Sequence, residues 1–307
     1  MQSTALRIGT RGSPLALAQA DETRSRLANV TGIDPAAIAI SAIRTTGDAI
    51  TDRPLAEAGG KGLFTKEIDE ALVAGQIDIG VHSAKDLATR LPDGIAIAAC
   101  LPRVDVRDVF ISTTAASLEA LPEGAVLGTS SLRRKALALR ARPDLNVIDL
   151  RGNVDTRLAK IERGEAHATL LAAAGLIRLG LLGRARSFLD AQTWVPAPGQ
   201  GSIAITARAD DTVMRHRLAL IDHRPTSIAL AAERAYLALL DGSCRTPIGG
   251  LALIDGDRIS FRGFIIKPDG SVAHEALRYG DAADGEEIAR AAAEELAGLG
   301  GPDFFSG

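Results

Sequence analysis

The chain has few aromatic residues, few cysteines and no long apolar runs. Aromatic residues make up only 3% of its 307 residues, which argues against the stacking surfaces that bind single-stranded nucleic acid. No apolar segment follows Met1-Gln2-Ser3, and no uninterrupted apolar run reaches membrane-spanning length, so we expect a cytoplasmic protein without a membrane partner. Cys100 and Cys244 lie far apart in the sequence, and we expect both thiols to be reduced.

Several common cofactor motifs are also missing. The five histidines show no metal-ligand spacing, so we predict no metal site. No G-x-G-x-x-G motif is present, and Gly59-Gly60-Lys61-Gly62 lacks the spacing of a phosphate-binding Walker A loop. We interpret this glycine-rich stretch as a mobile flap that carries Lys61.

Strand-like and helix-like segments alternate through the first two thirds of the chain, which is typical of mostly parallel sheets covered by helices. The first series consists of strands at 6–9, 38–43, 77–81 and 95–101, with helices at 13–29, at 61–74 and from Ala84 onward. The second series consists of strands at 109–111, 125–127, 146–150 and 168–173, with helices at 132–140 and 154–162. Two connectors rich in Pro and Gly, 102–108 and 194–201, flank the second series.

The segment 202–206 is a strand without an α/β unit of its own, so we expect it to pair with the first series. This pairing gives two connections between two lobes, and two connections can act as a hinge that closes a cleft. From 227 onward a helix at 228–240 precedes strands at 248–254, 258–266 and 272–279 and a helix at 285–299. The predicted fold is α/β, with two doubly wound, hinged domains like those of periplasmic binding proteins and a small C-terminal α+β domain. The expected domains are 1–101 with 202–220, 107–195, and 223–307.

Positive charge is concentrated in the second series, although the whole chain has a net charge of −3. Gly128-Thr129-Ser130-Ser131-Leu132-Arg133-Arg134 and Arg151-Gly152-Asn153-Val154-Asp155-Thr156-Arg157 each follow a strand and precede a helix. Ligands bind at this end of the strands in open α/β sheets. Helix-start N–H groups, hydroxyls and guanidinium groups suit several carboxylates or phosphates. The local charge predicts a small polyanion in a cleft and argues against a nucleic-acid partner.

Three other positions are candidates for chemistry. Asp86 follows a strand in Val81-His82-Ser83-Ala84-Lys85-Asp86. It is either a carboxylate that caps a helix or a carboxylate at the cleft. In the second case it shuttles protons or stabilises a developing cation. Arg11 ends the first strand and is either a surface residue or a second anion clamp. Cys244 is flanked by Gly, Ser, Arg and Thr and fits an accessible thiol, whereas Cys100 fits a buried one. No base lies near Cys244 in sequence, which favours covalent anchoring over repeated nucleophilic turnover.

The chain resembles the porphobilinogen deaminase (hydroxymethylbilane synthase) family over nearly its whole length. The resemblance is carried, in family order, by 7–16 (RIGTRGSPLA), 59–64 (GGKGLF), 81–86 (VHSAKD), 128–134 (GTSSLRR), 151–157 (RGNVDTR), 172–180 (AAAGLIRLG), 198–201 (PGQG) and 244–249 (CRTPIG). It implies a transferase of tetrapyrrole biosynthesis that joins four porphobilinogen units head to tail, releases ammonia at each step and hydrolyses the product to hydroxymethylbilane.

The resemblance also implies residue roles. Asp86 is the catalytic carboxylate, and Cys244 holds a dipyrromethane cofactor through a thioether. Further cofactor contacts are Ser83, Lys85, Asp86, Thr129, Ser130, Ser131, Arg133 and Arg134. Substrate contacts are Arg11, Ser13, Gln19, Lys61, Phe64, Arg151, Asn153, Arg157, Arg178 and Gln200. We expect a monomer, because no apolar stripe calls for a partner.

This sequence departs from the family pattern at Glu57, where the flap often carries a second Lys, and at Ser243, where Gly is common. Glu57 puts the role of that position in substrate contact in doubt. Two alternatives remain open: a hinged two-lobe protein that binds a polycarboxylate without chemistry, and a phosphate-ester enzyme that needs a metal.

Overall fold

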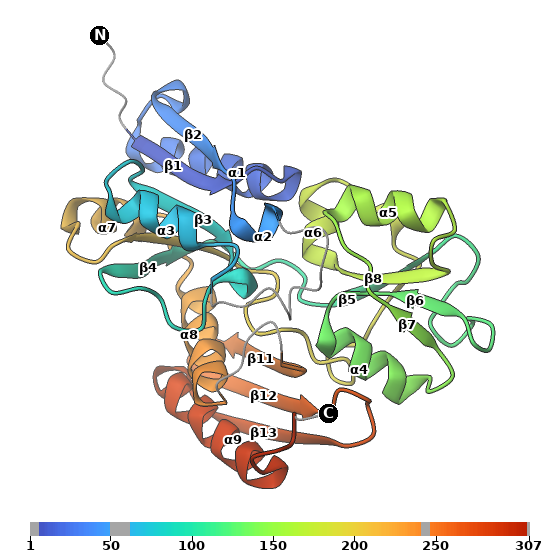
Figure 1. Ribbon diagram of the computed structural model, residues 1–307. Coiled ribbons are helices and arrows are strands. Elements are labelled where there is room, and N and C mark those ends of the chain that lie inside the picture. Colours follow the sequence, from blue (N-terminus) through green and yellow to red (C-terminus); the bar gives the residue numbers. More distant parts are fainter. Residues whose placement is uncertain (1–5, 50–61, 241–245, 306–307) are drawn as a thin grey trace.

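The computed structural model describes residues 6–49, 62–240 and 246–305, which fold around three separate sheets (Figure 1). In the first sheet the strand order is β2-β1-β3-β10-β4. Strand β10 runs antiparallel to β3 and β4, so the expected return of the chain to the first sheet is confirmed. The strands are β1 (Leu6–Arg11), β2 (Ile38–Ile43), β3 (Ile79–Ser83), β4 (Ile95–Cys100) and β10 (Ile203–Arg208).

The helices around this sheet largely follow their sequence signals. Helix α1 begins after Ser13, whose hydroxyl accepts a hydrogen bond from the Ala16 N–H, and it ends at Gly32 in a left-handed conformation with φ 70°. The other helical segments are α2 (Thr46–Ala49), α3 (Lys66–Val73) and α7 (Thr212–Ala219), while α1 spans Pro14–Thr31 and a short 3₁₀ turn η1 spans Pro35–Ala37.

The helix predicted from Ala84 onward is wrong. Only one 3₁₀ turn, η2 (Ala84–Asp86), forms there, and Ser83 makes no side-chain cap. The Ser83 hydroxyl instead hydrogen-bonds the Gln19 side chain. Beyond the turn, Arg234 binds the carbonyls of Ala88 and Thr89, and these residues form a bent, non-helical connection.

The second sheet has the strand order β7-β6-β8-β5-β9, and α4 and α5 lie on opposite sides of it (Figure 1). The predicted helices at 132–140 and 154–162 are present as α4 (Leu132–Ala141) and α5 (Val154–Glu162). The strands are β5 (Asp108–Ser112), β6 (Val126–Gly128), β7 (Asn146–Ile148), β8 (Ala168–Ala172) and β9 (Ser187–Phe188). Two short helical segments, α6 (Ala173–Arg178) and the 3₁₀ turn η3 (Leu182–Arg184), complete this part.

The third sheet is antiparallel, in the order β11-β12-β13, and two helices cover one of its faces (Figure 1). Tyr236 of α8 is fully buried in this core, and its hydroxyl donates to the Phe264 carbonyl. The elements are β11 (Ile248–Asp255), β12 (Arg258–Ile266), β13 (Ala273–Asp281), α8 (Arg224–Leu239), η4 (Ala282–Asp284) and α9 (Gly285–Gly300). The chain is therefore mixed α/β with a small C-terminal α+β unit.

The third sheet packs against both other parts of the chain. Phe264 and Ile266 belong to the same buried cluster as Trp194 and Val195 of the second connector. At the turn between β12 and β13, Gly270 approaches α4 so closely that a Cβ would lie 2.6 Å from the Ala136 carbonyl oxygen. Leu230 of α8 packs in a cluster with residues of β4 and β10. The third sheet thus forms a common base for the two larger sheets.

Candidate active site

A large cavity opens where the three parts of the chain meet. Its volume is about 1590 Å³, and its walls come from the carboxyl ends of β1, β3, β6, β7 and β8, from the second connector and from α8. The predicted site residues that line it are Arg11, Ser13, Gln19, Phe64, Ser83, Lys85, Asp86, Thr129, Ser130, Ser131, Arg133, Arg134, Arg151, Asn153, Arg157, Arg178 and Gln200. Cys244 and Lys61 lie outside the described residues.

Asp86 shares one guanidinium with a second carboxylate. Arg11 Nη1 lies 3.6 Å from Asp86 Oδ2, while its Nε lies 3.2 Å from Asp48 and its Nη2 makes a closer contact with the same carboxylate. The guanidinium also lies over the Phe64 ring, 4.2 Å from the ring centre. Burial alone would lower the pKa of Arg11, but the hydrogen bonds that Arg11 donates to Asp48 and the charges of Asp86 and Asp48 raise it. Two carboxylates and one guanidinium leave this trio with a net charge of −1.

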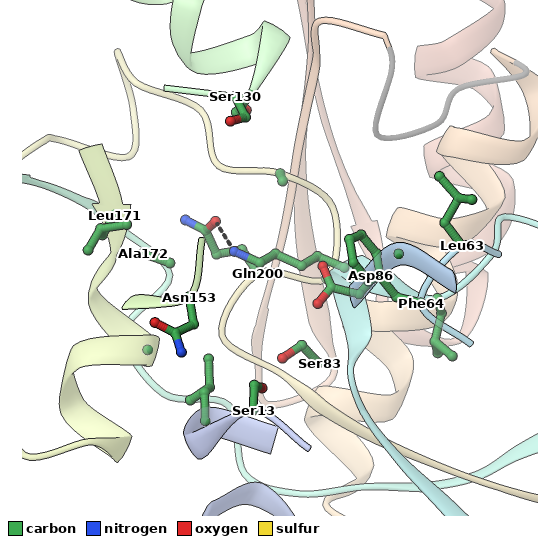
Figure 2. A pocket seen from close by; sticks show the side chains of 18 of the residues that line it. Ser13, Leu63, Phe64, Ser83, Asp86, Ser130, Asn153, Leu171, Ala172 and Gln200 are labelled. Atoms are coloured by element: carbon green, nitrogen blue, oxygen red, sulfur yellow. Dashed lines mark hydrogen bonds between the residues drawn. The ribbon is translucent and has the colours of Figure 1, made fainter. Parts of the chain in front are cut away.

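Figure 2 shows the Asp86 side chain in the cavity, with Ser83 and Ser13 nearby and Asn153 projecting from the other lobe. Gln19, which is 2% exposed, fixes Ser83 through a hydrogen bond of 2.9 Å between Nε2 and Oγ. His82 is not among the residues that line the large cavity: it is buried, bonded to Thr206 Oγ1 at 3.0 Å, and burial together with the charge of Arg11 lowers its pKa to about 4. A buried, neutral histidine bonded to a hydroxyl is typical of a structural residue.

Arg133 and Arg134 converge on one buried carboxylate that the sequence analysis did not single out. Their Nη2 atoms each lie 2.7 Å from an oxygen of Asp108, whose side chain is 0% exposed. Trp194 Nε1 and Gln200 Nε2 also donate to Asp108, at 3.1 and 2.8 Å. Burial alone would raise the pKa of Asp108, but the two guanidinium groups hold it far below its usual range. The Nε atoms of both arginines are buried without a hydrogen-bond partner.

Gln200 links the two lobes through its side-chain amide. Its Nε2 donates to the Val106 carbonyl and to Asp108, both at 2.8 Å, while its Oε1 accepts from Lys85 Nζ at 3.3 Å (Figure 2). Burial, together with the charge of Arg134, lowers the pKa of Lys85 to about 8, and Asp86 opposes this shift. Both amide hydrogens of Gln200 are therefore used within the protein.

Helix α5 supplies a second group of cavity residues. Asn153 caps the helix by accepting from the Thr156 N–H at 2.8 Å. Arg157, one turn further on, has a buried Nε without a hydrogen-bond partner, and burial together with the charge of Arg134 lowers its pKa to about 10. Arg178 closes this wall by donating to the Gly201 carbonyl at 3.0 Å and by lying 3.8 Å from Glu22.

Comparison with known proteins assigns the chain to a family. Residues 6–216 match the family model described as porphobilinogen deaminase, dipyromethane cofactor binding domain, and residues 227–298 match porphobilinogen deaminase, C-terminal domain. The chain belongs to the porphobilinogen deaminase family. Porphobilinogen deaminase of Nitrobacter winogradskyi is 58% identical over 97% of this chain and 95% of that protein. The protein of the same name from Paracoccus denitrificans is 53% identical over 98% of this chain and 96% of its own length.

Among solved structures, the chain is similar to a nutrient binding protein from Burkholderia cenocepacia bound to methionine. The TM-score is 0.45 and the sequence identity is 14%, and the match covers 70% of this chain and 90% of that one. A periplasmic substrate-binding protein of an ABC transporter from Coxiella burnetii gives a TM-score of 0.44 and 15% identity over 75% and 96% of the two chains.

The cavity of this porphobilinogen deaminase family member fits the dipyrromethane cofactor named by its family model. The cofactor carries carboxylates and pyrrole N–H groups. The buried, unbonded Nε atoms of Arg133 and Arg134 can donate to the carboxylates, and the Asp86 carboxylate can accept from the N–H groups. No group of three or more His, Cys, Asp or Glu that could hold a metal occurs among the described residues. Within the same residues no helix is both long and apolar enough to cross a membrane.

The sequence analysis missed three acidic residues of the porphobilinogen deaminase site: Asp48, Asp108 and Glu233. Asp108 fell in a stretch interpreted as a connector, and Asp48 lies next to no recognised motif. Glu233, 0% exposed, binds Arg103 and accepts from the Gly199 and Ala252 N–H groups. Asp48 lies 37 residues from Arg11, Asp108 lies 25 and 26 residues from its two arginines, and Glu233 lies 34 and 19 residues from Gly199 and Ala252. One sequence carries no signal for such pairs.

Proposed function

We propose that this chain is a transferase that joins four porphobilinogen units head to tail, releases ammonia at each step and hydrolyses the product to hydroxymethylbilane. The observation that carries the proposal is the position of Asp86, 3.6 Å from Arg11 in a cavity that arginines from a second sheet also line. Such a cavity suits a substrate that is anionic at its side chains and becomes cationic at its reacting carbon.

We propose that Asp86 stabilises this cation. When porphobilinogen loses ammonia, its C–N bond breaks and the remaining methylene carbon is electron-deficient. A free pyrrole α-carbon then forms the new C–C bond and loses its proton. The trio of Asp86, Arg11 and Asp48 has a net charge of −1, and a preformed negative charge beside a developing cation lowers the barrier. Because Asp48 takes most of the hydrogen bonds of Arg11, the Asp86 carboxylate keeps acceptor capacity.

We propose that the dipyrromethane cofactor is attached through a thioether to Cys244. Thr246, two residues further along the sequence, lines the cavity. When bound, the cofactor supplies the free pyrrole α-carbon to which the first unit is joined. Ser83, Lys85, Asp86, Thr129, Ser130, Ser131, Arg133 and Arg134 would hold it.

The carboxylates of the substrate units would be held by a second set of side chains. Gln200 contributes indirectly, because its amide positions Lys85. The set consists of Arg11, Ser13, Gln19, Lys61, Phe64, Arg151, Asn153, Arg157 and Arg178. Residues 1–101 with 202–220, residues 107–195 and residues 223–307 would form three domains, hinged at the two connectors. The chain would act as a cytoplasmic monomer without nucleic-acid or membrane partners.

Incubation of the purified protein with porphobilinogen tests the proposal. Ammonia and hydroxymethylbilane should form, and intact-mass analysis should find a dipyrromethane adduct that maps to Cys244. An unmodified thiol and unchanged porphobilinogen would support the two-lobe binder instead. Full activity in a metal chelator would exclude the phosphate-ester enzyme, which needs a metal.

A further inference from the structure

A second, much smaller cavity lies behind Asp86. Its volume is about 40 Å³, against about 1590 Å³ for the large cavity. Arg11, Ser83 and Asp86 line both cavities, whereas Thr65 and His82 line only the small one. Thr65 and His82 are 1% and 5% exposed, so the small cavity lies on the interior side of Asp86.

The size and the polar lining of the small cavity suit water. A buried water needs roughly 10–15 Å³ of space and about two to four polar partners, whereas a typical small-molecule site has roughly 300–1,000 Å³. The lining residues include a carboxylate, Asp86, a guanidinium, Arg11, and two hydroxyls, those of Thr10 and Thr65. The Thr10 hydroxyl already donates to the Val81 carbonyl at 3.0 Å, so it can only accept from a water.

The pair of Arg11 and Asp86 leaves a gap that a water can bridge. Arg11 Nη1 and Asp86 Oδ2 are 3.6 Å apart, which is too far for a direct hydrogen bond. A water that accepts from one group and donates to the other is enthalpically nearly as good as a direct bond. Because both residues line the small cavity, a water there can accept from Arg11 and donate to Asp86.

Thr65 has a buried hydroxyl that lacks a hydrogen-bond partner among the described residues. It precedes α3 as the N-cap residue, but its side chain makes no cap hydrogen bond. The hydroxyl acts on Asp69, one turn further along α3: burial raises the pKa of Asp69 to about 6, and Thr65 opposes this shift. A hydroxyl has one donor and two acceptor sites. The influence of Asp69 therefore leaves the acceptor sites of Thr65 to a water.

His82 is the other polar side chain on the interior wall. Its Nε2 is bonded to Thr206 Oγ1 at 3.0 Å, so a bond to a water has to come from Nδ1. Burial and the charge of Arg11 lower the pKa of His82 to about 4, and the ring is therefore neutral at neutral pH. His82 can hold a water without taking a proton from it.

We propose that the small cavity is a site for ordered water, which bridges Arg11 and Asp86 and is held from the interior by Thr65 and His82. The water keeps Arg11 and Asp86 from closing into a direct ion pair. The Asp86 carboxylate stays hydrogen-bonded at its interior side and keeps its charge toward the large cavity. The effect of the water on turnover rests on the proposed function, in which Asp86 stabilises a developing cation.

A crystal structure of the wild-type holoenzyme, at a resolution that shows ordered water, tests the site. A water should lie about 2.7–3.2 Å from both Asp86 and Thr65 Oγ1. A small cavity without water density would overturn the site, and so would Arg11 and Asp86 in direct hydrogen-bond contact. This measurement needs no turnover, so its outcome is separate from that of the proposed function. Wild-type protein that forms no hydroxymethylbilane would contradict only the latter.

The variant T65V removes the hydroxyl but keeps the shape of the side chain. Its kcat should fall about two- to tenfold, the range of one net hydrogen bond, with KM unchanged, because Asp86 then closes on Arg11. T65S keeps a hydroxyl and should regain most of the lost rate.

D69N is the matched control for T65V, because Asp69 interacts with Thr65 but lines neither cavity. Its kcat should stay near the wild-type value. A T65V variant with wild-type kcat would contradict the role of the water, and equal losses in T65V and D69N would do the same. If T65V does not fold, the wild-type crystal structure decides.

Discussion

Asp108 offers the sharpest test of how the arginines are held. Replacing it by Asn keeps its shape but removes the charge that faces Arg133 and Arg134, which are 4% and 6% exposed. Breaking a buried ion pair by removing one partner costs about 3–5 kcal/mol, a large share of the roughly 5–15 kcal/mol by which a protein is stable. For a chain of 307 residues, the loss corresponds to a fall of about 5–8 °C in Tm.

Calorimetry on D108N and on a matched control, D281N, measures this loss. Asp281 pairs with Arg258 in an exposed ion pair whose side chains are 64% and 65% exposed, so its neutralisation should cost less than about 1 kcal/mol. D108N should also purify with less bound cofactor, because two guanidinium groups lose their anchor. A Tm for D108N within about 2 °C of wild type would refute the argument that Asp108 organises the site.

The remaining predictions concern Asp48 and Lys85. D48N should leave Arg11 to pair fully with Asp86 and so lower kcat about tenfold, equivalent to about 1.4 kcal/mol of barrier. The control D78N breaks the ion pair with Arg7 outside the cavity and should keep the wild-type kcat. Equal rates for D48N and D78N would contradict the role of Asp48. Because the pKa of Lys85 is lowered to about 8 in the absence of ligand, the Lys85 ammonium group loses its proton as the pH rises through 8. Assembly of the cofactor by the apoprotein should therefore slow above that pH. The K85R variant, which stays charged, should not show this decrease in rate. A wild-type assembly rate that stays flat from pH 7 to 9.5 would count against Lys85 as a cofactor contact.

The sequence predicted most of the elements and the convergence of the site because both depend on local signals. Strand ends followed by Ser, Thr, Arg or Asp mark one edge of a parallel sheet, and this edge brought Asp86, Thr129 and Arg157 into one cavity. The predicted helix after Ala84 is absent for a different reason. Gln19 binds the Ser83 hydroxyl that would cap the helix, and Arg234 binds the Ala88 carbonyl, and both residues come from distant parts of the chain.

The pairing of Arg133 and Arg134 with a protein carboxylate could not be predicted, because it also depends on contacts between distant parts of the chain. Arg133 and Arg134 were expected as anion clamps, and they line the cavity, but they are buried against Asp108. That arrangement depends on β5 lying beside β8 in a register that pairs Asp108 with Ala172, a long-range property that periodicity and spacing do not contain.

The rate of hydroxymethylbilane formation by D86N, followed with intact mass and Tm on the same samples, tests the central claim most directly. If the Asp86 carboxylate stabilises the cation in carbon–carbon bond formation, D86N should retain its fold and cofactor yet lose about 10²-fold or more in turnover. A folded, cofactor-bearing D86N that forms product at near the wild-type rate would contradict the account.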